Sequence, residues 1–368
     1  MRLLVPIVAA LRLLWLGKSI QGDFSIVRVI SDNESLFVFL PANADTESTA
    51  KLSLFWNSRA GHAIVQRSSE GDEVGLRRFR VLRNMGEPIT PVSGAWLSGW
   101  LGENGDDFGF HSGLIGCMYH NHFCQLPNGT QAFRLDGDAS KWVIHIHGRK
   151  ASYAETLRNA QQFESLGFTQ LAISHESDDK PFGLGKKRTA LGEREWRQVS
   201  SAVDYARNNG AQNIILFGWS LGGLFINQFL KMSSDLSKVR AVIFDSPLLD
   251  YRSTLQLQAG RSGYARDLAD RVIRVLKSSP MIPLLGFPNV DVARLSSLDK
   301  PLPTSIPALL FFSSNDGFVS MNGVYRYREL NPKTKLVEIF GARHCRLFNE
   351  NLNKYQKEIG KFIDALQI

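Results

Sequence analysis

The 368-residue sequence has few cysteines, no internal repeat and no low-complexity tract. Cys117, Cys124 and Cys345 are too few, and odd in number, to form a disulfide framework, so we expect reduced thiols. Cys117 and Cys124 are the exception, since they could pair across a tight segment if the protein is exported. Hydrophobic residues make up 43% and charged residues 21%, which is typical of a globular protein with a buried core.

Long hydrophobic runs are also missing, apart from residues 3–16 near the N-terminus. This run follows Arg2 and suggests a signal peptide or an anchor, but Arg12 and Pro6 interrupt it and no small-residue cleavage site stands out. It is shorter than the roughly 18–20 apolar residues that cross a bilayer. Two interpretations of residues 1–20 stay open: a membrane-associated or export segment, and a helix packed on the protein itself. The cellular location therefore also stays open.

The sequence lacks a concentrated charge of one sign, although its formal net charge is +8. The basic residues are scattered, and the densest patch is Arg77-Arg78-Phe79-Arg80 with Arg83. That patch alternates as a strand with one solvated face does. Because no recognition motif accompanies the charge, we predict no nucleic-acid partner.

Two regions differ in their apolar patterns. Between Asp23 and Leu135, short apolar runs are divided by polar turns, which predicts a β-rich N-terminal region over residues 21–115. Its expected strands cover residues 24–30, 36–40, 52–56 and 74–82. A hairpin around Asn128-Gly129 is expected to join residues 123–126 to 131–135. The second region is assigned to residues 116–368.

From Lys141 onward, strand-like and helix-like segments alternate, which predicts a mostly parallel sheet with helices on both faces. The expected strands cover residues 142–147, 170–174, 213–217, 239–245, 308–312 and 335–340. The expected helices cover residues 151–166, 191–209, 221–232 and 350–366. Residues 250–305 do not alternate, contain a helical run near 265–277, and read as a cap inserted over a pocket.

The sequence Gly218-Trp219-Ser220-Leu221-Gly222 is the central functional signal. A serine hydroxyl is a weak nucleophile until it is exposed and held against a base. A sharp strand-to-helix turn provides that exposure and needs small residues two before and two after the serine. An apolar strand precedes this motif and a helix with an apolar face follows it, so we predict that Ser220 is a nucleophile.

A catalytic base and a catalytic acid are expected in the loops that follow the strands over residues 308–312 and 335–340. His344 follows a strand by a short loop and precedes the last helix, which suits a general base. Asp316 follows the strand over 308–312 and would orient the imidazole. Asp245 and Asp250 are rivals for this role, and Asp316 is preferred because the order Ser, Asp, His places the acid after the cap.

The loop His147-Gly148-Arg149-Lys150 follows the first strand of the alternating region. Its position predicts that the backbone N–H of Arg149 supplies one oxyanion donor, and the N–H of Leu221 the other. The side chains of Arg149 and Lys150 could bind a substrate carboxylate or phosphate. Pairing with Glu155 or a nearby aspartate is the favoured alternative.

No cofactor and no metal are predicted. His120, His122 and Cys124 would share one face of a strand, but a fourth ligand and the usual zinc spacing are missing, so a polar strand face is favoured. Cys345, next to the predicted base, is interpreted as a small packed residue and not as a nucleophile.

Three further motifs carry a resemblance to a known family. They are His147-Gly148-Arg149 after a strand, Leu191-Gly192 with Glu195-Trp196 at a helix start, and Asp245-Ser246-Pro247 at a strand end. With them, residues 142–366 resemble the catalytic domain of α/β hydrolases of the prolyl-oligopeptidase-like and acyl-aminoacyl-peptidase-like branch, close to uncharacterised bacterial hydrolases. The resemblance implies the α/β-hydrolase fold, a Ser220–His344–Asp316 triad, and oxyanion donors at Leu221 and Arg149. The region before Lys141 is too short for a β-propeller, so gating of that kind is not implied.

The expected function is hydrolysis of an ester, thioester or amide through an acyl-enzyme, with a small-molecule acyl substrate and a carboxylic ester favoured. Acyl transfer on the same triad is a second hypothesis, because a capped, water-poor pocket would favour a bound acceptor over water. A non-catalytic binding protein that kept the fold is a third. Membrane association through residues 1–20 and the oligomeric state stay open.

Overall fold

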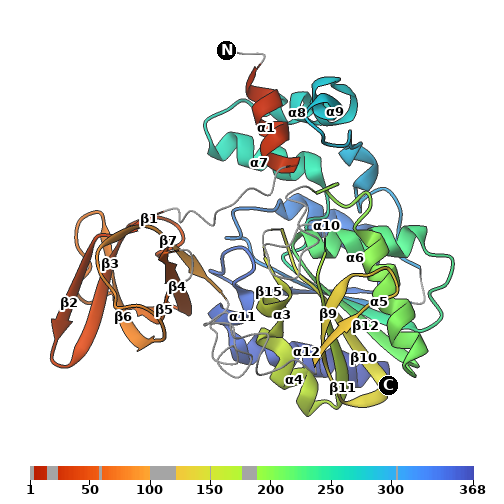
Figure 1. Ribbon diagram of the computed structural model, residues 1–368, viewed down its shortest axis with the longest axis horizontal. Coiled ribbons are helices and arrows are strands. Elements are labelled where there is room, and N and C mark those ends of the chain that lie inside the picture. The colour runs from red at the N-terminus through yellow and green to blue at the C-terminus, as the bar shows by residue number, and fades with distance from the viewer. Residues whose placement is uncertain are drawn as a thin grey trace.

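The computed structural model describes residues 4–14, 24–57, 60–99, 122–149, 151–175, 189–303 and 306–368. Two separate β-sheets organise these residues, with an antiparallel sheet to one side of a larger mixed sheet (Figure 1). The predicted boundary at residues 115/116 lies outside the described residues.

The N-terminal sheet has the strand order β1-β7-β4-β5-β6-β3-β2 and is antiparallel throughout. Its strands are β1 (Phe24–Ile26), β2 (Arg28–Asp32), β3 (Ser35–Pro41), β4 (Lys51–Trp56), β5 (Gly61–Arg67), β6 (Leu76–Asn84) and β7 (Val92–Ser98). The expected strand over 24–30 is interrupted at Val27, because β1 pairs with β7 whereas β2 pairs with β3. The sequence analysis missed β5 and β7. Trp56 and Phe79 are fully buried in the core of this sheet.

The larger sheet has the order β15-β14-β13-β12-β10-β11-β9-β8. Its strands are β8 (Phe123–Gln125), β9 (Gln131–Leu135), β10 (Asp138–Ile146), β11 (Phe168–Ile173), β12 (Asn213–Trp219), β13 (Val239–Asp245), β14 (Ala308–Phe312) and β15 (Thr334–Glu338). Strands β10 to β15 are parallel, and the β8–β9 hairpin adds two antiparallel strands. The chain leaves β10 toward β11 and then returns to β12 on the other side of β10. This reversal is the kind of switch point where α/β sheets bind ligands.

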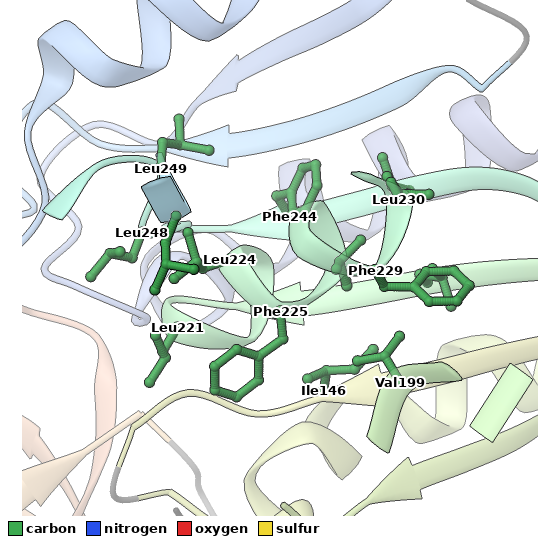
Figure 2. Close-up of a cluster of buried hydrophobic side chains, with 14 of the residues drawn as sticks. Ile146, Val199, Leu221, Leu224, Phe225, Phe229, Leu230, Phe244, Leu248 and Leu249 are labelled. Atoms are coloured by element: carbon green, nitrogen blue, oxygen red, sulfur yellow. The ribbon is translucent and has the colours of Figure 1, made fainter. Parts of the chain in front are cut away.

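Helices cover both faces of the larger sheet, because neighbouring strand residues point to opposite sides. Helices α5 (Trp196–Asn208), α6 (Leu221–Met232) and α10 (Met321–Leu330) pack on one face, and α4 (Ala160–Ser165) and α12 (Leu352–Leu366) on the other. Along β12, Leu216 faces the first set of helices and Phe217 the second. Figure 2 shows Leu224 and Phe229 of α6 within this first core, with Ile146, Val199 and Phe244 close by. Helix α6 is thus buried along most of its length.

Three predicted helices differ from the structure at their ends. The expected helix over 151–166 is divided into α3 (Tyr153–Thr156), a 3₁₀ turn (Leu157–Asn159) and α4. The helix expected from residue 191 begins at Trp196, because Leu191 and Gly192 have positive φ angles of 56° and 108°. The buried carboxylate of Glu195 accepts hydrogen bonds from the N–H groups of Ala190 (2.7 Å) and Gly192 (2.9 Å) and fixes this turn.

The last predicted helix, over residues 350–366, is α12, which begins at Leu352. A short helix that was not predicted, α11 (Leu347–Glu350), precedes it, and the two meet at Asn351. The Asn351 side chain accepts a hydrogen bond of 3.0 Å from the N–H of Lys354, so it caps the N-terminus of α12.

The segment between β13 and β14 forms a helical cap. It contains α7 (Tyr251–Arg261), α8 (Asp267–Ser278), α9 (Met281–Leu284) and a 3₁₀ turn (Val292–Leu295). The sequence analysis expected α8 but missed α7. Asp250, one rival for the catalytic acid, caps α7 by accepting from the N–H of Ser253 at 2.7 Å. The Asp250 carboxylate therefore stabilises the N-terminus of α7 in the helical cap segment.

Helix α1 (Leu4–Leu14) packs on the cap beside α8, as Figure 1 shows. Ala10 and Leu14 are fully buried, whereas Leu4 and Val8 are exposed. This is the arrangement expected of a helix packed on the protein. Within the described part of the chain, no helix combines the length and apolar character needed to span a bilayer.

Candidate active site

Ser220 lies at the sharp turn between β12 and α6, with backbone angles φ 48° and ψ −115°. Its conformation is in a region that non-glycine residues rarely adopt, and such strain is concentrated at functional sites. Both glycines of the motif are required by close packing. A Cβ atom on Gly222 would lie 2.7 Å from the carbonyl oxygen of His147, and one on Gly218 would lie 2.7 Å from Cδ1 of Ile226.

His344 lies in the loop after β15, and its Nε2 is 2.8 Å from Oγ of Ser220. Its Nδ1 is 2.8 Å and 3.0 Å from the two carboxylate oxygens of Asp316. With Nδ1–H donating to Asp316, Nε2 is left to accept the hydroxyl proton of Ser220. The structure therefore brings together the three residues that the sequence pointed to, although they are up to 124 positions apart in the chain.

Asp316 is 3% exposed and lies in the turn after β14. Its Oδ1 also accepts hydrogen bonds of 2.8 Å from the N–H groups of Phe318 and Val319. Burial opposes its ionisation, but the charge of His344 and these donors hold the pKa of Asp316 below its usual value.

The environment of His344 also shifts its pKa. Burial alone would lower the pKa of His344, yet the adjacent Asp316 carboxylate raises it well above its ordinary value. The ring of Phe318 lies against the imidazole, with 4.8 Å between centroids. The Asp316 turn thus fixes the position of the imidazole and favours its charged form.

Asp245, the other rival acid, is fully buried at the end of β13. Its carboxylate accepts 2.8 Å and 2.9 Å hydrogen bonds from the hydroxyls of Tyr355 and Ser246. Burial raises the pKa of Asp245. Ser246 in turn accepts a 3.1 Å hydrogen bond from the N–H of Cys345, the residue after His344. Asp245 therefore supports the histidine loop through Ser246, a role that the sequence analysis did not anticipate.

The loop after β10 approaches Ser220 closely, because a Cβ on Gly148 would lie 3.1 Å from Cβ of Ser220. Leu221 is the first residue of α6, so its N–H belongs to the helix end next to the hydroxyl. These positions suit the two predicted oxyanion donors.

The Arg149 side chain makes a contact that the sequence analysis did not anticipate, beside the pairing with Glu155 or a nearby aspartate that it favoured. Its guanidinium donates to the carbonyl oxygens of Arg12 (2.7 Å) and Leu13 (3.1 Å) at the C-terminal end of α1. Terminal helix carbonyls lack partners within the helix, so they attract a cationic donor. Lys150 lies outside the described residues.

The cysteines and the suggested metal ligands do not converge in the described ranges, where no group of three His, Cys, Asp or Glu side chains could hold a metal ion. His122 Nδ1 is 3.0 Å from the carbonyl oxygen of Arg134. Burial raises the pKa of the Cys345 thiol, which favours its protonated, less nucleophilic form. Cys117 and His120 lie outside the described residues. The Cys117–Cys124 pairing and the metal ligation by His120 therefore also lie outside them.

The N-terminal sheet contacts the loop that carries His344. The nearly buried guanidinium of Arg346 donates to the carbonyl oxygen of Leu97 at 3.0 Å and lies 3.5 Å from a carboxylate oxygen of Asp45. Asn349 donates to the carbonyl oxygen of Lys51 at 3.1 Å. The only signal in the sequence was that Arg343 and Arg346 flank His344, and it did not indicate their partners.

A groove of about 430 Å³ lies between α1 and the cap helices α7 and α8. Apolar side chains form most of its lining, and the polar residues that contribute are Arg12, Gln258 and Ser262, together with the Tyr264 hydroxyl. No carboxylate is found among the described residues that line it. The groove is therefore suited to an apolar group and not to an ammonium.

Comparison with known proteins gives structural likeness without sequence likeness. No protein-family model matches the chain, and no curated protein does either. Alpha/beta hydrolase domain-containing protein 10 from mouse is similar over 66% of this chain and 98% of its own, with 17% identity and a TM-score of 0.50. The esterase Pf2001 of Pyrococcus furiosus is 20% identical over 67% of this chain and 90% of its own, with a TM-score of 0.49.

At such identities structural likeness establishes the fold and not the activity. Together with the sheet order and the turn at Ser220, it shows that the chain has the α/β-hydrolase fold predicted from its sequence, with a helical cap and a β-rich N-terminal region. It does not distinguish the prolyl-oligopeptidase-like branch from others.

Proposed function

We propose that the protein is a serine hydrolase that cleaves a carboxylic ester through an acyl-enzyme intermediate. The observation that supports this most strongly is the continuous hydrogen-bonded chain from Ser220 Oγ through the His344 imidazole to Asp316, with a separation of 2.8 Å at each step. A nucleophile, a base and an oriented carboxylate within these distances form the arrangement used in acyl transfer.

In this proposal Oγ of Ser220 attacks the carbonyl carbon of the ester while Nε2 of His344 takes the hydroxyl proton. The imidazolium is stabilised by Asp316 and returns the proton to the alkoxide that leaves. Water then attacks the acyl-enzyme, with His344 again as base, and releases the acid and free Ser220. The Asp316 carboxylate, which raises the pKa of His344, stabilises the imidazolium that forms when Nε2 takes the proton.

The N–H groups of Leu221 and Arg149 are proposed to stabilise the oxyanion that forms on the carbonyl oxygen. One donor comes from the N-terminus of α6, where the helix dipole favours negative charge. The other comes from the loop that packs on Ser220 through Gly148.

The choice of an ester over a peptide rests on the sequence, in which no feature marks a site for a peptide N-terminus. The resemblance to the prolyl-oligopeptidase-like branch makes aminoacyl amides the rival substrates. Acyl transfer to another acceptor and non-catalytic binding stay predictions, because no contact described above favours either.

The test combines covalent labelling with turnover. A fluorophosphonate probe should label the wild type and Ser278→Ala, whose substituted serine is exposed on α8, but not Ser220→Ala. p-Nitrophenyl esters should be hydrolysed faster than aminoacyl p-nitroanilides. Thermal unfolding of each variant confirms that it is folded. Labelling of folded Ser220→Ala at the wild-type rate would refute the proposal.

A further inference from the structure

More positive charge lies beside the acid of the triad than the neighbouring carboxylates balance. We propose that Arg261 and Arg343 form a binding site beside Gly317 for an oxyanion, that is, a phosphate or a carboxylate group. The site stands independently of the proposed ester hydrolysis. A free anion and a charged group carried by the substrate offer the same chemistry, and the test separates these two sources.

The two guanidinium groups meet at Gly317, the residue after Asp316. A Cβ atom on Gly317 would lie 2.5 Å from Nη1 of Arg343 and 2.6 Å from Nη1 of Arg261. The two nitrogens therefore lie at most about 5 Å apart, and charged N–H···O bonds of about 2.8 Å let one oxygen atom accept from both. Glycine at this position, with a φ of 73°, leaves room for both side chains.

Few acceptors in the described part of the chain offset these charges. Arg343 donates through Nη1 to the carbonyl oxygen of Asn315 at 2.6 Å, and its Nε lies 3.4 Å from a carboxylate oxygen of Asp45. Asp45 is shared with Arg346, at 3.5 Å. Arg261 has no hydrogen-bond or ion-pair partner among the described residues. Two cations this close repel each other, and an anion bound between them relieves the repulsion.

The acceptors of the adjacent turn are already engaged. Asp316 is 3% exposed, and its carboxylate is hydrogen bonded to Nδ1 of His344 at 2.8 Å. The carbonyl oxygens of Gly317 and Phe318 accept from Nε2 of Gln258 at 3.1 Å and 2.9 Å. The guanidinium of Arg261 is therefore left to bind a ligand.

A second groove, of about 440 Å³, gives such a ligand room. It lies between α7 and the N-terminal end of α10, and both Arg261 and Arg266 line it. No carboxylate is found among the described residues of this lining. Ser320, which also lines it, is the N-cap residue of α10. The unpaired N–H groups and the dipole of a helix favour negative charge at this end.

The proposed site adjoins both loops that carry the triad. Arg343 directly precedes His344, and Gly317 directly follows Asp316. An anion held between Arg261 and Arg343 therefore joins the cap helix α7 to the loop of the base and the turn of the acid.

The experiment measures the binding of inorganic phosphate to the full chain by isothermal titration calorimetry at low salt. Arg261→Met should weaken binding about 10- to 100-fold, which is the contribution of a hydrogen bond from a charged group. Arg274→Met is the matched control, because Arg274 is exposed on α8 and does not line the groove. It should leave the affinity unchanged. Thermal unfolding of each variant confirms that it is folded.

Two esters separate the sources of the anion. 4-Acetoxybenzoate carries a carboxylate that methyl 4-acetoxybenzoate lacks, and both present the same acetyl group. If the anion belongs to the substrate, Arg261→Met lowers kcat/KM for 4-acetoxybenzoate about tenfold or more and leaves the methyl ester unchanged. If the anion is free, phosphate binding is lost and the ratio of the two esters stays constant.

Two results distinguish this site from the hydrolase. Phosphate binding that is absent or unaltered in folded Arg261→Met, together with an unaltered ratio of the two esters, would refute the anion site alone. Phosphate binding that depends on Arg261, in a protein that hydrolyses no ester, would support the site and refute the hydrolase proposal.

Discussion

Replacement of Gly222 by alanine tests whether the tight turn at Ser220 governs reactivity. The added Cβ would lie 2.7 Å from the His147 carbonyl oxygen and nearer still to that of Ile146, both at the end of β10. Ordinary contact begins near 3.4 Å, so the turn and the strand end must separate by about 1 Å. The residues that move apart include Ser220 and the loop containing Gly148 and Arg149.

The effect on stability should be modest and the effect on rate large. Overpacking costs about 1–3 kcal/mol, and alanine in place of glycine returns up to about 1 kcal/mol in a helix. The variant therefore stays folded, because domains have about 5–15 kcal/mol of stability. A misplacement of about 1 Å between nucleophile and oxyanion donors lowers the rate about 100-fold.

The assay is the second-order rate of fluorophosphonate labelling, measured beside thermal unfolding. Gly360→Ala is the control, because Gly360 lies in α12 and a Cβ there meets nothing within 4 Å. That variant should label at the wild-type rate and gain about 0.5–1 kcal/mol in stability. Wild-type labelling by folded Gly222→Ala would refute the claim that this close approach positions the reacting groups.

Three further outcomes are expected. Asp316→Asn should lower kcat/KM on the order of 10⁴-fold. Because the carboxylate raises the pKa of His344, its loss should also move the acid limb of the pH–kcat/KM profile to lower pH, and an unmoved limb would contradict this. Arg346→Met, which removes one of the contacts between the N-terminal sheet and the histidine loop, should cost about 1–3 kcal/mol in urea unfolding. Arg326→Met, which removes an exposed ion pair, should cost under about 0.5 kcal/mol. Cys345→Ala should keep fluorophosphonate labelling within a few fold, since the raised pKa of its thiol favours the less nucleophilic protonated form, and complete loss would show a direct role.

The site was more predictable than the path of the chain around it. Ser220 and His344 stand out because a strand, a sharp turn and a helix leave a local signature. The helix start at Trp196 was placed too early, because Glu195 reads as a helix former yet is used to hold a turn in which Leu191 has positive φ. Helix α7 was missed because its apolar residues do not repeat on one clear face.

The side-chain partners of charged residues were the least predictable feature. The sequence analysis favoured pairing of Arg149 with Glu155 or a nearby aspartate, and it did not anticipate that Arg149 donates to carbonyl oxygens 136 and 137 positions away in α1. A guanidinium can donate to any carboxylate or carbonyl within reach, so its partner depends on which segments the fold places beside it. The same applies to the contact between Arg346 and Leu97.

The sequence by itself determined the alternation of strands and helices, and with it the two-sided sheet and the turn that presents Ser220. Those features depend on local periodicity and on glycines at fixed spacing, which neighbouring residues specify. Only the tertiary structure decided that α1 completes a groove with the cap, and that the N-terminal sheet supports the loop of His344. These contacts join segments that are distant in the chain, and their geometry depends on how whole elements pack together.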